Sequence, residues 1–154
     1  MLFRSIKNLS ELKTAAQVAV PNDPTNLGRA LLLLEKQGLI KLKKDAGLSA
    51  TVLDIVENSK QLKIVELEAA QLPRSLEDVD LAVINTVYAS QIDLLPTRDG
   101  LFVEDKQSPY VNLIVAREEN QNEQKVKQFV QAYQSDEVYN AAAELFNGGV
   151  VKGW

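Results

Sequence analysis

The segment spanning residues 17–38 constrains the fold most strongly, because a short apolar run leads directly into a helical pattern. A strand is predicted over residues 17–20 and ends at a proline. Asp23 and Pro24 are suited to the cap and the first position of a following helix, and Gly38 is suited to its end. The leucines of this helix recur at helical spacing: Leu27, Leu31 and Leu34. A strand followed at once by a helix predicts an α/β unit.

Similar patterns recur along the rest of the chain. Strands are predicted over residues 62–67, 81–84 and 111–116, and the last two are continuous apolar runs, as expected for strands buried on both faces. In the C-terminal third, apolar residues at helical spacing predict helices over about 126–133 and 138–145. The alternation of strand and helix patterns predicts the α/β fold class.

Composition excludes several kinds of site. The 154 residues carry a net charge of -4, and because no basic stripe offsets it, we expect no nucleic-acid partner. The chain has no cysteine and no histidine, which removes disulfides, cysteine-based zinc sites and a Ser-His-Asp triad. A carboxylate-only site for a hard cation stays open. No nucleophile or base has an evident partner, so we expect no enzyme activity, no cofactor and no metal.

Polar residues at predicted strand ends are the candidate binding residues, because ligands of open α/β sheets bind there. Arg29 lies in the second turn of the first predicted helix and could hold a carboxylate through two hydrogen bonds, with Asn26 as a further donor. Asn85 directly follows the strand over 81–84, and its amide can both donate to and accept from an amino acid. Asn112 stands near the start of the strand predicted over 111–116 and needs a partner if it is buried.

Each of these residues also has a plainer interpretation. Arg29 could form a surface ion pair, and Asn26 could be solvated beside the helix cap. Asn85 could belong to a turn or cap the next helix, and Asn112 could bond to the backbone near a proline bend. On the residues alone, both interpretations stay open.

Six segments carry a more specific resemblance, and they occur in this order: VPNDPTNLGRALLLLEKQGLIKLK, LPRSL, LAVINTVYASQ, LFVEDKQSPYVNLIVAREEN, VKQFVQAYQSDEVYNAA and FNGGVVKGW. Together they resemble the MetQ/NlpA family, the methionine-binding lipoproteins of ABC importers. The similarity runs from about Ile6 to Trp154. It implies a substrate-binding component that takes up L- or D-methionine and delivers it to an ABC permease and its ATPase.

The resemblance also implies a periplasmic-binding-protein-like fold, in which two α/β lobes close like a clam shell. Residues 1–108 would form a nearly complete second lobe, and residues 109–154 would be the returning strand and C-terminal helices of the first lobe. Arg29 would clamp the carboxylate of methionine, while Asn85 and Asn112 would hydrogen-bond its polar end. Asn26 is carried over less directly.

The chain departs from the family pattern at its start. Family members are periplasmic lipoproteins of the inner membrane, yet residues 1–13 do not look like a signal peptide, and there is no lipobox cysteine. We therefore interpret the chain as N-terminally truncated. Burial of the methionine thioether, which contributes about 1.5–3 kcal/mol, would then be reduced. We expect weak or absent methionine binding and self-association through uncovered apolar faces. The alternative function is a non-binding remnant or an interaction module.

Overall fold

A computed structural model describes residues 2–3, 6, 8–104, 112–150 and 152–154 of the chain. They fall into two compact units, Met1–Glu104 and Asp105–Trp154, which we call unit 1 and unit 2. The predicted lobe boundary between residues 108 and 109 lies outside the described residues.

Three parallel strands form the centre of unit 1. β2 (Gln17–Pro21) lies between β5 (Lys63–Leu67) and β6 (Leu81–Val83) and runs parallel to both. All three strands were predicted, and the parallel arrangement of the α/β class is confirmed for them. Because the strands are parallel, their carboxyl ends lie at one edge of the sheet.

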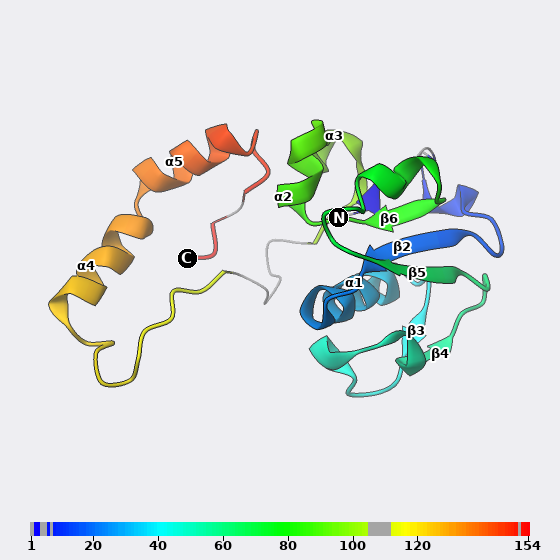
Figure 1. Ribbon diagram of the computed structural model, residues 1–154, viewed down its shortest axis with the longest axis horizontal. Coiled ribbons are helices and arrows are strands. Elements are labelled where there is room, and N and C mark those ends of the chain that lie inside the picture. Colours follow the sequence, from blue (N-terminus) through cyan, green and yellow to red (C-terminus); the bar gives the residue numbers. More distant parts are fainter. Residues whose placement is uncertain (1, 4–5, 7, 105–111, 151) are drawn as a thin grey trace. The chain divides into compact units, whose positions relative to one another are not determined.

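Two short strands complete the five-stranded sheet, whose order is β5-β2-β6-β1-β7. Figure 1 labels its strands β5, β2 and β6. β1 (Leu2–Phe3) pairs antiparallel with both β6 and β7 (Gly100–Phe102). A separate two-stranded antiparallel sheet joins β3 (Lys41–Leu42) to β4 (Ile55–Glu57). Sequence analysis predicted neither β1 nor β7, because strands of two or three residues carry too little of a periodic pattern.

Helix α1 (Pro24–Lys36) begins directly after β2, as the local residue pattern predicts. Asp23 caps it by accepting a hydrogen bond from the Asn26 backbone N–H at 3.0 Å, and Pro24 occupies the first helical position. The helix ends at Lys36, and Gly38 follows its C-cap with a φ of +68°, in the left-handed region that glycine adopts without strain. The N-terminal turn of α1 therefore stands at the carboxyl end of β2.

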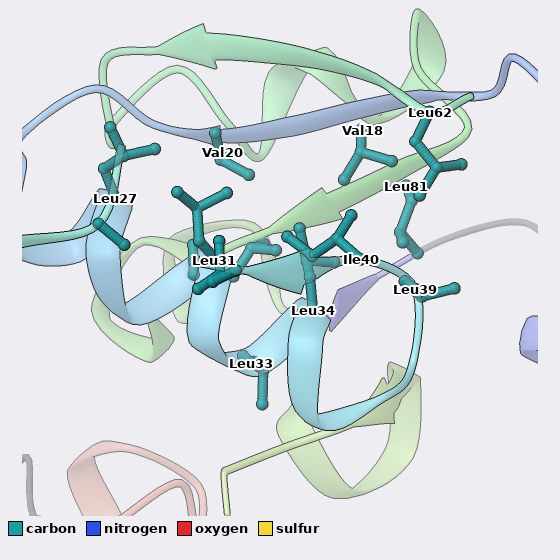
Figure 2. Close-up of a cluster of buried hydrophobic side chains, with 14 of the residues drawn as sticks. Val18, Val20, Leu27, Leu31, Leu33, Leu34, Leu39, Ile40, Leu62 and Leu81 are labelled. Carbon is teal, nitrogen blue, oxygen red and sulfur yellow. The ribbon is translucent and has the colours of Figure 1, made fainter. Parts of the chain in front are cut away.

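The core of unit 1 lies on both faces of the central sheet. Val18 and Val20 of β2 face α1, and Figure 2 shows Leu31 and Leu34 of that helix pointing toward them. Ala19, between the two valines, belongs to a second buried cluster on the opposite face. That second cluster consists of Ala19, Leu72, Ala82, Ile84 and Ala89. Each large aliphatic side chain that is fully buried contributes about 1.5–3 kcal/mol to folding.

Gly28 of α1 allows an unusually close backbone contact. A Cβ atom at this position would lie 2.6 Å from the carbonyl carbon of Leu48, and closer still to its oxygen. Leu48 belongs to the 3-10 turn Gly47–Ser49, which packs on α1. The glycine therefore lets the helix and this turn meet backbone to backbone.

The remaining helices of unit 1 are short. α2 (Thr86–Ala89) follows β6 and covers the sheet face opposite α1 (Figure 1), while α3 (Pro96–Asp99) precedes β7. The other helical pieces are 3-10 turns: Leu9–Glu11, Gly47–Ser49, Val52–Asp54, Arg74–Glu77 and Ser90–Ile92.

Unit 2 contains the two helices predicted for the C-terminal third, α4 (Gln124–Tyr133) and α5 (Asp136–Leu145). Ser135 caps α5 by accepting a hydrogen bond from the Val138 N–H at 3.3 Å. Several apolar side chains of these helices are exposed: Phe129 by 58% and Leu145 by 75%. No helix in the described parts of the chain has the length and apolar character that crossing a bilayer requires.

The strand predicted over residues 111–116 is wrong for residues 112–116, which are irregular. Leu113 is 76% exposed and Val115 is 87% exposed, so the run is not buried either. An apolar run becomes a strand only where a neighbouring strand satisfies its backbone groups. Among residues 112–150 and 152–154 the structure has helices but no strand to pair with it.

Candidate functional site

Polar residues gather at the carboxyl edge of the parallel strands. Asn22 and Asp23 follow β2, and Asn85 follows β6. Asn22 is tied to the residue that follows β5, because its Nδ2 donates to Glu68 Oε1 at 2.9 Å. The adjacency of β2 and β6 thus places the start of α1 beside Asn85.

A hydrogen-bond network links the cap of α1 to the end of β6. Asn26 Nδ2 donates to both carboxylate oxygens of Asp23, at 3.1 and 3.0 Å. Asn26 Oδ1 in turn accepts a hydrogen bond from Asn85 Nδ2 at 2.9 Å, although the two residues are 59 positions apart. Asn26 and Asn85 are therefore brought together, and Asn26 is more than a solvated residue beside a cap.

The other end of the Asn85 amide is buried without a partner in the described structure. Its Oδ1 is shielded from solvent and accepts no hydrogen bond. Asn85 stands at the N-cap position of α2, but its side chain makes no capping bond there. A buried acceptor left without a donor costs about 1–3 kcal/mol, so such atoms are rare in stable folds. The amide is held with its donor toward Asn26, and its acceptor has no donor among the described residues.

Arg29 lies on the same side of α1 as Asn26, because residues three apart on a helix are neighbours. Its Nε donates to Glu104 Oε1 at 2.6 Å, and one Nη donates to Glu104 Oε2. The Arg29 side chain is 34% exposed and that of Glu104 is 20% exposed. The guanidinium therefore already holds a carboxylate through two bonds.

Glu104 is a site residue that sequence analysis missed. It follows the apolar residues Leu101, Phe102 and Val103 at the end of β7. The rule that singled out Asn85, a polar residue directly after an apolar run, applies to it equally. It was missed because β7 itself was not predicted.

Asn112 belongs to unit 2, and its side chain is exposed in the irregular segment 112–116. Its convergence with Arg29 and Asn85 stays a prediction.

Two shallow grooves lie on unit 2. The larger has a volume of about 430 Å³ and runs along α4, lined by Val126, Val130 and Trp154 among others. Polar side chains of α4 also line the larger groove, the smaller one is bordered by Leu113, Ile114 and Val115, and neither is lined by the polar network of unit 1. Across the part of the chain that the structure describes, no three acidic side chains are grouped as a metal site would need.

Comparison with known proteins connects the chain to binding proteins. A family model described as NlpA lipoprotein matches residues 3–154. The D-methionine-binding lipoprotein MetQ of Escherichia coli K12 is 71% identical over 153 residues, covering 98% of this chain and 56% of that protein. This chain therefore spans just over half the length of that curated relative.

Two solved structures have the same fold over almost the whole chain. One is a nutrient-binding protein from Burkholderia cenocepacia bound to methionine, with 51% identity and a TM-score of 0.90. The other is an ABC transporter periplasmic substrate-binding protein from Coxiella burnetii, with 50% identity and a TM-score of 0.89. In both comparisons 99% of this chain is covered, against 65% and 64% of the solved chains.

Proposed function

Because this chain belongs to the NlpA lipoprotein family, we propose that it forms part of a methionine-binding site in the substrate-binding component of an ABC importer. The observation that carries this proposal is the buried Asn85 Oδ1, which lacks a hydrogen-bond donor beside the Asn26 and Arg29 end of α1. We take methionine as the ligand because the descriptions of the relatives name it. Binding is non-covalent, so no bond is made or broken.

The chemistry of the three unit 1 residues suits the charged head of a free amino acid. Arg29 offers a planar set of N–H donors to the ligand carboxylate, which such donors bind through two parallel bonds. Asn85 Oδ1 accepts an N–H of the ligand ammonium and thereby gains its missing partner. Asn26 fixes the Asn85 amide through its 2.9 Å hydrogen bond, and Asn112 contributes a further polar contact.

The proposal extends to the architecture of the whole protein. Residues 1–108 form the second of two lobes, and residues 109–154 return to the first lobe. Methionine lies between the lobes, and the closed form is delivered to the permease and ATPase of the importer. The site of action is the periplasm, where lipoproteins of this family are attached to the inner membrane.

A second candidate function is a non-binding remnant or an interaction module. Exposed apolar side chains of unit 2 favour it: Leu113, Val115, Phe129 and Leu145. Apolar patches of this kind promote self-association. Sedimentation that shows a concentration-dependent oligomer, together with no response to methionine, would support this candidate.

The test of methionine binding is a titration of this chain, followed by NMR at the side-chain amide of Asn85. We expect the Asn85 signals to shift with methionine and not with methioninol, which lacks the carboxylate. Affinity should be weak, in the range of about 1 mM, because Arg29 is one-third exposed and exposed ion pairs contribute only about 0–1 kcal/mol. Arg29→Ala should abolish the shift, whereas Arg98→Ala, at an exposed arginine paired with Asp99, should leave it unchanged.

Two outcomes would contradict these expectations separately. If no methionine concentration shifts the Asn85 amide of the folded chain, the binding proposal is wrong. If a monomeric chain binds with micromolar affinity, the site stands and the expected weakness is wrong.

A further inference from the structure

The ion pair between Arg29 and Glu104 joins two distant parts of unit 1. Arg29 lies in the second turn of α1, and Glu104 follows β7, 75 positions later in the chain. Glu104 binds the guanidinium along one edge, through Nε and one Nη. The methionine site described above gives this carboxylate no role.

The geometry of the pair fixes more than the charge of Arg29. A guanidinium is planar and carries five N–H groups, so two bonds along one edge set both the position and the plane of the whole group. The edge taken by Glu104 includes Nε, the nitrogen attached to the side-chain stem. The hydrogen bond at Nε therefore restrains the aliphatic part of the Arg29 side chain as well as its guanidinium.

The environment of the pair makes this restraint effective. The Arg29 and Glu104 side chains are 34% and 20% exposed, whereas those of the Lys41–Glu57 pair are 61% and 65% exposed. Ion pairs that are partly shielded from water are screened less than exposed ones. A flexible arginine must otherwise be ordered when a ligand binds, and this ordering reduces affinity.

We propose that Glu104 is a positioning residue, which holds the Arg29 guanidinium in the plane that the carboxylate of the bound amino acid meets. This inference rests on the proposed function, since it assigns Arg29 to the ligand carboxylate. Glu104 itself does not touch the ligand. It acts by ordering Arg29 before the ligand arrives.

The test uses Glu104→Gln, which keeps the shape of the side chain but removes its charge. Without ligand, we expect the Arg29 Nε–H of this variant to exchange faster with water and to lose its rigid NMR relaxation. With methionine, we expect an affinity about 10-fold lower, roughly the effect of losing one charge-assisted hydrogen bond. Glu104→Asp, which restores the charge on a shorter stem, should recover part of both. Glu57→Gln, at the exposed pair with Lys41, should change neither readout.

The outcomes separate this inference from the proposed function. A purely structural ion pair would lower the melting temperature of Glu104→Gln without changing methionine affinity, and that result overturns the inference. Tighter binding by Glu104→Gln also overturns it, because Glu104 would then compete with the ligand carboxylate. If the wild-type chain does not respond to methionine, the proposed function fails. The water-exchange rate of the Arg29 Nε–H then still tests whether Glu104 orders Arg29. If this rate is the same in wild type and in Glu104→Gln, the inference is overturned.

Discussion

Replacement of Asn85 by alanine should affect binding far more than folding. The Asn85 amide makes one hydrogen bond, from Nδ2 to Asn26 Oδ1, and leaves its buried Oδ1 without a donor. Most buried side-chain amides have hydrogen-bond partners at both ends. Alanine removes the hydrogen bond and the unsatisfied acceptor together, so their energetic effects oppose each other.

The two effects have similar sizes. Loss of the bond to Asn26 costs about 0.5–1.5 kcal/mol, and loss of the buried side-chain carbon costs about 0.8 kcal/mol. Removal of the unsatisfied acceptor raises the unfolding free energy by about 1–3 kcal/mol. The net change in unfolding free energy for Asn85→Ala should therefore be close to zero, within about 1–2 kcal/mol.

Asn58 offers a matched control, because both ends of its amide are satisfied. Its Nδ2 donates to the Leu62 carbonyl at 2.9 Å, and its Oδ1 accepts from the Leu62 N–H at 2.8 Å. Asn58→Ala loses two bonds of about 1 kcal/mol each and leaves two backbone groups of Leu62 unpaired. It should therefore destabilise the chain by clearly more than Asn85→Ala.

Urea unfolding of the two variants, with and without methionine, measures both quantities. Methionine should raise the unfolding free energy of wild type and of Asn58→Ala but not of Asn85→Ala, because a ligand stabilises only the state that it binds. The reasoning is refuted if Asn85→Ala is destabilised as much as Asn58→Ala, since Asn85 would then be a structural residue.

Further predictions concern the fold around the site. Gly28→Ala should lower stability by up to about 2 kcal/mol, because a backbone carbonyl lies in the path of the new Cβ. The overpacking costs about 1–3 kcal/mol, against a helix-propensity gain of about 1 kcal/mol; thermal unfolding that shows a gain in stability would contradict this. Leu31→Ala, at a fully buried side chain, should cost about 2–5 kcal/mol in urea unfolding. Leu53→Ala, at a side chain that is 91% exposed, should cost less than about 0.5 kcal/mol, and equal losses in the two variants would show that the core is misassigned. Hydrogen bonds from Thr51 lower the pKa of Asp54 below its ordinary value of 3.8, so its contribution to stability is present above that value and is lost as pH falls through the folded pKa. Asp54→Asn should therefore flatten the acid limb of a stability–pH curve, and an unchanged limb would show that these bonds do not act on the ionised form.

The strand–helix passage of β2 and α1 could be predicted from sequence because its determinants are local. The proline, the Asp23 cap and the leucine spacing all lie within the segment that they specify. β1 and β7 depend instead on partners far along the chain, as in the pairing of Leu2 with Val83 and Phe102. The same dependence explains the error at residues 112–116, where an apolar pattern does not reveal whether a partner strand exists.

Only some residues of the candidate site could be predicted from the sequence. Asn26 and Asn85 could be placed together because parallel strands end at one edge, and each residue follows a strand that was predicted. Glu104 was not predicted because the strand that precedes it, β7, was not predicted. The unsatisfied state of Asn85 Oδ1 could not be predicted at all, since it depends on every atom packed around the amide rather than on the residue itself.

The backbone contact at Gly28 bears on the residue beside it. At this point of α1 the carbonyl of Leu48 leaves no room for any side chain larger than hydrogen, so the helix and the turn meet through their backbones. Arg29, the next residue of α1, directly follows this backbone contact. Under the proposed function, the acidic group of the ligand is therefore met by an arginine whose helix is in direct backbone contact with the turn Gly47–Ser49.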